Sequence, residues 1–315
     1  MGAFVVSLDF ELFWGVRDVL PLHEYRDNLL GERLAVTALL ERFTQRGVRA
    51  TWATVGALFC ATREELLAAM PERRPRYLER RQSPYEALDE IGADERADPV
   101  HFGASLVKAI ASASGQELAT HTFSHFYCLE PGQTADDFDA DLATAQRLAQ
   151  PFGGVRSLVF PRNQYNPAYR NVLVRRAIRT YRSNGTYWAY APSTTYEPPA
   201  KRAVRLADAY LPISGPHTHR VRKDGDGLVD VPASAFLRPY SHRLRHLDRV
   251  RVGRIRRAMS HAADHDECFH LWWHPHNFGV NLRENMAVLD AILDHFDVLR
   301  RKGRLESKHM GDFAA

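Results

Sequence analysis

Histidine and carboxylate side chains stand in this sequence where short apolar segments end. His121 and His125 frame the segment HTFSH, and a separation of four residues puts two imidazoles on one side of a helical turn, where they can chelate one cation. Asp9 and Glu11 end the opening apolar segment, and on a regular strand both carboxylates point to the same side. Two histidines and one carboxylate around a cation form a typical hydrolytic metal site. Either Asp9 or Glu11 can supply that carboxylate; the alternative is that the two acidic residues merely end a strand at solvent.

The four-residue histidine spacing is informative only in its context. Random placement of 15 histidines gives about 0.7 such pairs, and the chain contains four. Two of them, His242/His246 and His261/His265, lie in Arg-rich or Asp-rich helical surroundings and are interpreted as exposed helix faces. Only the HTFSH pair lies at a predicted strand-to-helix junction, and this pair is the candidate metal site.

Further polar residues follow other predicted strands. Arg162 and Asn163 come after the fourth, and His274 and His276 come after the last. The carboxyl ends of all strands of a parallel barrel lie on one face, so residues far apart in the sequence are expected to converge there.

The elements that must position these residues are strands that alternate with helical segments. Helical spacing of apolar residues predicts helices over Asn28–Arg46, Asp136–Gln150 and Arg283–Lys302. The alternation predicts an α/β protein with a mainly parallel sheet or barrel. The predicted strands are Ala3–Leu8, Val48–Val55, Glu117–Thr120, Ser157–Phe160, Thr180–Ser183, Leu228–Val231 and Cys268–Trp273.

We expect one domain over residues 1–315, interrupted twice. The stretch from about 63 to 100 is highly charged, carries several prolines and has no strand signal, so it is interpreted as a helical insertion. The stretch from about 188 to 227 is rich in Pro and Gly and is interpreted as long loops over one end of the barrel.

Composition limits the classes of function. The 42 Lys and Arg against 38 Asp and Glu leave a net charge of +4, which does not call for a nucleic-acid partner. Arginines crowd Pro71–Arg81 and Arg243–Arg257, which favours solvated helix surface over a patch for phosphates or an anionic membrane.

Three cysteines without CxxC spacing favour a reducing compartment. No signal peptide and no apolar run of membrane-spanning length is recognisable, so a cytoplasmic location is expected.

Four segments, taken in order, resemble the NodB homology motifs of the polysaccharide deacetylases of carbohydrate esterase family 4. They are SLDFEL, HTFSH, VFPRNQYN (Val159–Asn166) and LWWHPHNFG (Leu271–Gly279). The resemblance implies a distorted (β/α)7-type barrel, Asp9 as the catalytic base, His121 and His125 as metal ligands, and His274 as the general acid. It also implies that Arg162 orients Asp9 and that the divalent metal is Zn²⁺.

The sequence departs from the family pattern in three places. Phe10 stands where the common first motif has its metal aspartate, so the resemblance assigns the ligand role to Glu11 as in some relatives, with Asp9 as the alternative. The third motif is reordered to PRNQ, which leaves Arg162 either on Asp9 or on substrate. His276 has no counterpart in the short form of the last motif and is assigned to substrate or to a hydrogen bond with His274.

Together these observations predict a metal-dependent hydrolase that removes an acetyl or formyl group from an amino sugar. A cytoplasmic location favours a nucleotide-linked or lipid-linked sugar of surface-glycan biosynthesis over a cell-wall polymer. The alternatives are a metal-free cyclic amidase of the same fold, like the allantoin hydrolases, and an inactive glycan-binding protein. Residues expected to contact the substrate flank the motifs: Trp14, Asn163, Tyr165, Trp273, His276 and Asn277.

Overall fold

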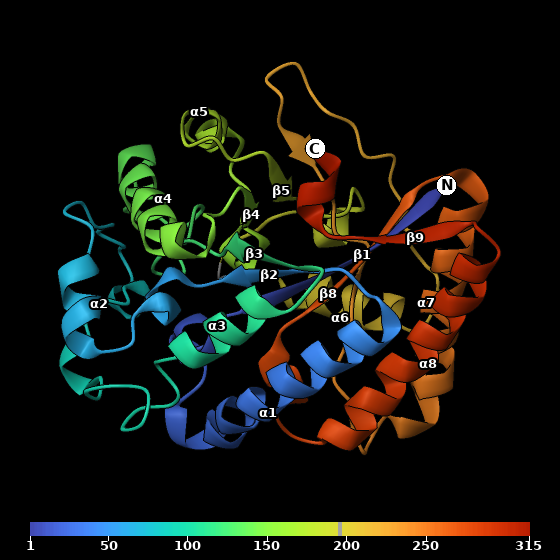
Figure 1. Cartoon of the computed structure of the whole chain (residues 1–315), viewed down its shortest axis with the longest axis horizontal. Coiled ribbons are helices and arrows are strands. Elements are labelled where there is room, and N and C mark those ends of the chain that lie inside the picture. Colours follow the sequence, from blue (N-terminus) through green and yellow to red (C-terminus); the bar gives the residue numbers. More distant parts are fainter. Residues whose placement is uncertain (195–196) are drawn as a thin grey trace.

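A single curved parallel sheet, wrapped by helices, forms the framework of the protein (Figure 1). The computed structural model describes residues 1–194 and 197–315. Within them, the strand order is β6-β5-β4-β3-β2-β1-β8-β7, with β9 also paired to β1, and every pair of neighbouring strands is parallel. The strands are β1 (Gly2–Phe10), β2 (Ala50–Thr54), β3 (Gln116–Thr120), β4 (Ser157–Val159), β5 (Thr180–Arg182), β6 (Val229–Asp230), β7 (Ala235–Phe236), β8 (Cys268–Trp273) and β9 (Leu305–Lys308).

The connection between β6 and β7 shows how strongly the sheet curls. These two strands are the outer members of the strand order, yet only four residues, 231–234, join them. A connector of that length spans about 17 Å at most, so the two edges of the sheet must face each other. The connector also bonds to both sides, from Val231 N–H to the Tyr181 carbonyl and from Ser234 N–H to the His270 carbonyl, each at 2.9 Å. The predicted distorted barrel is confirmed.

The alternation of side chains along β1 separates the core from the site. Phe4, Val6 and Leu8 face outward into the main hydrophobic cluster beneath the helices, where each is fully buried. Val5 faces inward and joins a smaller apolar cluster, and further along the same inner face the strand carries Asp9. The barrel interior is therefore apolar near the amino end of β1 and polar at its carboxyl end.

The helices are α1 (Leu22–Arg46), α2 (Arg63–Ala69), α3 (Ala104–Ser112), α4 (Ala135–Ala149), α5 (Arg170–Arg175), α6 (Pro199–Asp208), α7 (Asp248–His265) and α8 (Leu282–Arg301). In Figure 1, α1, α3, α7 and α8 lie on one side of the sheet and α4 and α5 on the other. Helices α1 and α8 are linked by ion pairs of Arg46 with Asp294 and Asp297, at 2.7 and 2.5 Å.

The three helices expected from apolar spacing are present: α4 and α8 are shifted by one residue, and α1 begins at Leu22, six residues before the predicted start. The predicted strands match seven of the observed ones. The strands β7 and β9 were not expected. The range 63–100 contains α2 and two short 3-10 turns, and the range 188–227 contains α6 in addition to loops; Thr195 and Tyr196 lie outside the described residues.

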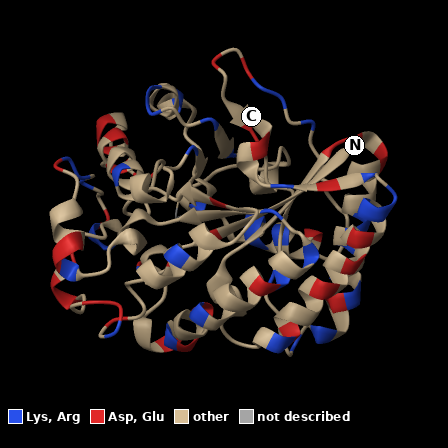
Figure 2. Cartoon of the chain, viewed as in Figure 1, with Lys and Arg blue, Asp and Glu red and all other residues tan. Residues whose placement is uncertain are grey.

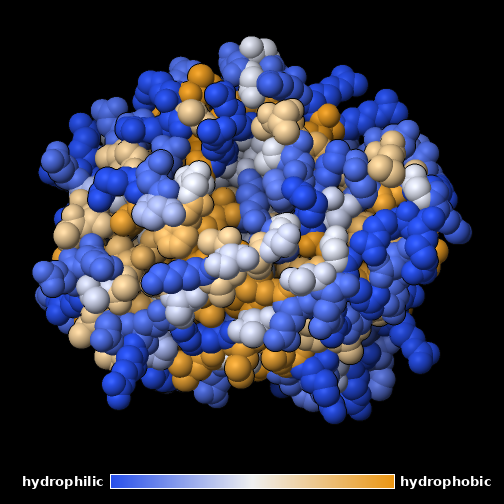
Figure 3. All heavy atoms as spheres, in the orientation of Figure 1, coloured by the Kyte–Doolittle hydropathy of each residue, from blue (hydrophilic) through white to orange (hydrophobic). Residues whose placement is uncertain are grey.

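Charged residues of both signs are interspersed along the outer surfaces of α7 and α8 (Figure 2). On the face in Figure 3, hydrophilic residues dominate the periphery and hydrophobic residues appear mainly toward the centre. The arginines of Pro71–Arg81 are exposed, as expected. The arginines of Arg243–Arg257 were expected on a solvated helix surface, but Arg251 and Arg254 are buried, so this expectation was wrong for them. Among the helices of the described residues, none combines the length and the apolar character needed to cross a membrane.

Candidate metal and catalytic site

Glu11 lies between the two histidines of the HTFSH segment. Its Oε2 atom is 3.4 Å from His121 Nε2 and 3.2 Å from His125 Nε2, and all three side chains are buried. Space for the Glu11 carboxylate exists because residue 15 is glycine: a Cβ atom on Gly15 would lie 1.9 Å from the carboxylate carbon. Of the two carboxylates that the sequence left open, Glu11 is thus the one that meets both histidines.

The hydrogen bonds of His121 define which of its nitrogens is free. Its Nδ1 lies 2.8 Å from the Val159 carbonyl oxygen, which only accepts, so Nδ1 carries the proton. In the neutral ring, Nε2 then presents a lone pair to Glu11 Oε2, and within the described residues neither of these two buried atoms has a hydrogen-bond partner. Burial lowers the pKa of His125 to about 4, which keeps the His125 ring neutral. Lone pairs that converge in this way are stabilised by a cation, and a histidine held through Nδ1–H to a carbonyl is a usual metal ligand.

The HTFSH segment is not a helical turn, which corrects the expected geometry. Thr122 and His125 have left-handed backbone conformations, with φ of 64° and 57°, and α4 begins only at Ala135. A β-branched residue with positive φ is strained, and such strain is typical of functional sites. The Thr122 side chain holds the turn: its Oγ1 donates to the His121 carbonyl at 2.6 Å and accepts from Phe126 N–H at 2.7 Å.

Asp141 of α4 anchors this turn from behind. It accepts hydrogen bonds from the Phe123 and Ser124 N–H groups, at 2.6 and 3.4 Å, and from the Ser124 hydroxyl. Burial raises the pKa of Asp141 to about 6, although these hydrogen bonds oppose the shift.

Replacing Asp141 by alanine is expected to lower the free energy of unfolding by about 2–3 kcal/mol, because buried donors lose their acceptor. The loosened turn should also weaken zinc binding about 10–100-fold, the usual effect of losing a group that orients a ligand. Urea unfolding and zinc titration measure the two effects. Asp136→Ala, on the same helix with a side chain 69% exposed, is the control and should change neither; equal behaviour of the two variants would refute the anchoring role.

Asp9 is paired with Arg182, a residue that the sequence analysis did not single out. Both guanidinium Nη atoms lie 2.7 Å from the Asp9 carboxylate oxygens, and both side chains are buried. Burial opposes ionisation of Asp9, but the Arg182 charge, with the nearby His121 and His274, outweighs it and lowers the pKa. The signal was present in the sequence, because Thr180 and Arg182 are two residues apart and therefore share one face of the predicted strand Thr180–Ser183.

Arg162 does not take the place expected beside Asp9. Its Nη2 is bonded to both carboxylate oxygens of Asp18, at 2.8 and 2.7 Å, and its guanidinium lies over the Tyr127 ring at 4.7 Å. The reordered PRNQ motif explains the difference, because Arg162 and Asn163 both have left-handed backbone conformations after β4. Asn163 instead supports the base indirectly, since its Oδ1 accepts from Arg182 at 2.8 Å.

His274 and His276 complete the ring of groups around the two carboxylates. His274 Nε2 lies 3.8 Å from Asp9 Oδ2 and 3.7 Å from Glu11 Oε1. His276 Nε2 is 3.2 Å from the same Glu11 oxygen, and its Nδ1 is 2.7 Å from the Tyr25 hydroxyl on α1. Burial opposes ionisation of Glu11, yet the charge of His274 and the close contacts with His121, His125 and His276 hold the pKa of Glu11 well below its usual value.

Most of the aromatic residues expected to contact substrate are structural. Trp14 is buried and donates to the His101 carbonyl at 2.8 Å. Tyr165 stacks on Tyr181 at 5.0 Å. Trp273 is fully buried in the main hydrophobic cluster, against Phe278. The burial of Trp14 and Trp273 corrects their substrate assignments, whereas Tyr165 is only partly buried and its assignment stays a prediction.

Alternation along β8 explains the error for Trp273. Trp273 faces the helices, whereas its neighbour Trp272 lines a cavity on the inner side. Asn277 lies beside His276, with its Nδ2 3.3 Å from His276 Nδ1. Asn163 is the one member of the expected substrate set that lines the cavity.

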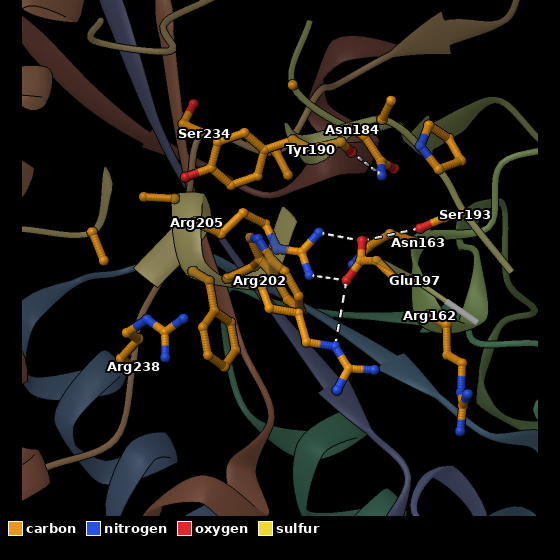
Figure 4. Close-up of a pocket in the computed structure, with 18 of the residues that line it drawn as sticks. Arg162, Asn163, Asn184, Tyr190, Ser193, Glu197, Arg202, Arg205, Ser234 and Arg238 are labelled. Carbon is orange, nitrogen blue, oxygen red and sulfur yellow. Dashed lines mark hydrogen bonds and ion pairs between the residues drawn. The ribbon is translucent and has the colours of Figure 1, made fainter. Parts of the chain in front are cut away.

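The cavity has a volume of about 410 Å³ and opens beside His274 (Figure 4). Its walls come from the strand ends, α6, α7 and the chain before α6. Asp208, at the end of α6, fixes this wall: it is fully buried and accepts from Tyr190 and Arg254 at 2.7 Å and from Ser214 N–H at 2.9 Å. The range 188–227 is therefore tied to α7.

Asp208→Asn is expected to lower the free energy of unfolding by about 3 kcal/mol at pH 7, because the buried Arg254 charge loses its partner. Burial opposes ionisation of Asp208, but its hydrogen bonds hold the pKa below the ordinary value of 3.8. The stabilisation is therefore complete above that value and is lost as the pH falls below it. Urea unfolding at pH 7 and pH 3.5 should give a smaller difference at the lower pH; a difference that grows would contradict the ion pair. Asp226→Asn, with a side chain 57% exposed, is the control.

Known proteins match this chain in their structure and not in their overall sequence. No protein-family model and no curated protein matches the sequence. A Mycobacterium smegmatis protein named a polysaccharide deacetylase aligns with 99% of this chain and 88% of its own, at TM-score 0.61 and 13% identity. A Pseudomonas aeruginosa PAO1 protein of the same name gives the same coverage at TM-score 0.52 and 12% identity, and Puue allantoinase does so at 0.54 and 11%. The chain thus has the fold of the polysaccharide deacetylases, as the sequence resemblance predicted.

Proposed function

We propose that this protein is a metal-dependent hydrolase that removes an N-acyl group, acetyl or formyl, from an amino sugar. The observation that carries the proposal is the convergence of Glu11 Oε2 and His121 Nε2 together with His125; in the described part of the chain these two buried acceptors have no hydrogen-bond partner. A set of two histidines and one carboxylate fits Zn²⁺ with open positions for water and substrate. When bound there, the cation supplies polarisation of the amide carbonyl and a lower pKa for the attacking water.

The remaining groups account for the proton transfers. Asp9, kept ionised by Arg182, accepts the proton of the attacking water as general base. His274, beside both carboxylates and at the edge of the cavity, donates a proton to the leaving amine. His276 positions Glu11 through its hydrogen bond and is itself held by Tyr25. Arg162, which lines the cavity, contacts the substrate rather than the base.

A nucleotide-linked or lipid-linked amino sugar is the substrate class that we favour. All three cysteines are buried free thiols, which supports action in a reducing compartment such as the cytoplasm. Activated sugars of surface-glycan biosynthesis are available there, whereas cell-wall polymers are not.

A metal-free cyclic amidase is the second candidate, because an allantoinase shares the fold. Fold alone does not assign chemistry, and the site decides between the two. The buried Glu11 Oε2 and His121 Nε2 atoms, which find no hydrogen-bond partner among residues 1–194 and 197–315, favour a bound metal. A purely glycan-binding protein would not need a base, an acid and a ligand set in one place.

The test uses purified protein with and without zinc, and measures acetate or formate release from a panel of N-acyl amino sugars and ring opening of allantoin. Zinc-dependent release of the acid from an amino sugar supports the proposal, and ring opening of allantoin by the metal-free protein supports the second candidate. No acid release from any amino sugar would refute the proposed hydrolysis.

A further inference from the structure

The cavity beside His274 is lined by arginines that outnumber their acidic partners. Five of them come from α6, α7 and the segment after β7: Arg202, Arg205, Arg238, Arg251 and Arg254. They share three carboxylates, those of Glu197, Asp208 and Asp248. Figure 4 shows the contacts of Arg202 and Arg205 with Glu197. The set therefore has a formal excess of two positive charges.

Arg238 is the member without a carboxylate. Among the described residues, no acidic side chain lies within ion-pair distance of its guanidinium. Figure 4 shows it apart from Glu197 and from the two arginines, Arg202 and Arg205, that contact Glu197. Burial and the neighbouring positive charges of Arg205 and Arg251 lower the pKa of Arg238 from its ordinary value. A half-buried guanidinium in such surroundings is destabilised unless an anion approaches it.

Arg251 and Arg254 provide a second, independent observation. They are only 2% and 6% exposed, and in the described part of the chain the Nε–H group of neither finds an acceptor. Buried donors are nearly always satisfied by protein, water or ligand. Both side chains line the cavity, so a hydrogen-bond acceptor of a bound ligand can approach them there.

Aromatic side chains connect this arginine-lined cavity with the catalytic groups. Trp272 lies 5.6 Å from His274 and 4.8 Å from Phe236, measured between ring centroids, and all three line the cavity. A ligand whose amide reaches His274 and Glu11 therefore extends along an aromatic wall toward the arginines. A volume of about 410 Å³ is within the range of small-molecule sites.

We propose that this cavity binds a phosphate or diphosphate group esterified to the amino sugar, so that the substrate is a glycosyl phosphoester and not a neutral sugar. The inference rests on the proposed function for the position of the sugar, but the anion site can be tested without turnover. Guanidinium groups suit this ligand because they form paired, charge-assisted hydrogen bonds with phosphate oxygens. A nucleoside diphosphate and a lipid diphosphate present the same chemistry.

Calorimetric binding of inorganic pyrophosphate, uridine diphosphate and decyl diphosphate to the zinc-loaded protein tests the site. We expect binding that weakens with added salt and at least tenfold weaker binding by Arg238→Ala. Arg202→Ala, whose side chain is 68% exposed, should also weaken binding and is the variant least able to disturb folding. Arg283→Ala on α8, with a side chain 93% exposed, is the matched control and should bind as the wild type does.

Tighter binding of uridine diphosphate would identify a nucleotide-linked substrate, and tighter binding of decyl diphosphate a lipid-linked one. Both outcomes support the anion site. No binding of any probe, or equal binding by all three variants, would overturn it. Acyl release from the panel of N-acetyl and N-formyl amino sugars, each as the free sugar, the 1-phosphate and the uridine diphosphate derivative, separates the two proposals: if none is hydrolysed, the proposed function fails while the binding result stands.

Discussion

Replacing His121 by alanine is expected to remove the bound metal and to lower turnover by about 10³-fold or more. The Lewis-acid contribution of a catalytic metal is several kcal/mol, which corresponds to a loss of this size. His121 is the ligand whose orientation is defined most clearly, since its Nδ1–H is fixed on the Val159 carbonyl and its Nε2 faces Glu11. Zinc content by elemental analysis and acyl release on the same samples measure both effects.

His274→Ala is the matched comparison for this variant. In the wild-type protein the Nε2 atom of His274 lies farther from Glu11 than the Nε2 atom of His121 or His125 does. The His274 side chain is 23% exposed and lines the cavity. We expect His274→Ala to retain zinc and to lose most of its turnover, because the leaving amine loses its proton donor. Full activity in either variant, or loss of zinc in His274→Ala alone, would contradict the assigned roles.

Replacing Arg182 by methionine is expected to damage both stability and catalysis. The change leaves the Asp9 carboxylate buried without its counter-charge, and removing one partner of such a pair costs about 3–5 kcal/mol of the free energy of unfolding. Since burial is the largest influence on Asp9 and acts to raise its pKa, the pKa rises once Arg182 is gone. The acidic limb of the kcat/KM profile should therefore move to higher pH.

Two further variants separate this effect from a general structural defect. Arg182→Lys keeps the positive charge and should return the acidic limb part of the way toward its original position. Arg162→Ala should leave that limb in place, because the Arg162 guanidinium pairs with Asp18 and not with Asp9. If the acidic limb moved in Arg162→Ala but not in Arg182→Met, Arg162 would be the residue that orients Asp9, and the pairing seen in the structure would be contradicted.

The barrel and the central part of the site were predictable because they depend on periodic patterns. The alternation in SLDFEL places Asp9 and Glu11 inside, and the carboxyl ends of parallel strands bring them to the histidines. The same alternation, applied strictly, would have identified Arg182 on β5 and Trp272 rather than Trp273 on β8.

Other features depend on tertiary contacts that no local pattern specifies. The HTFSH turn resembles a helical turn by spacing, but the hydrogen bonds of Thr122 and Asp141 hold it in a left-handed conformation. The charged run Arg243–Arg257 is typical of an exposed helix, yet Arg251 and Arg254 are buried because Asp248 and Asp208 pair with them. Asp208 lies in the range 188–227, which was predicted to be long loops, so nothing in the sequence indicated its ion pair with Arg254 of α7.

Stepwise return of zinc to chelator-treated protein, with acyl release measured at each step, tests the central claim most directly. The site formed by Glu11, His121 and His125 predicts that activity is absent without metal, rises with added zinc and reaches its plateau at one equivalent per chain. Acyl release at the full rate from protein that contains no metal would contradict it.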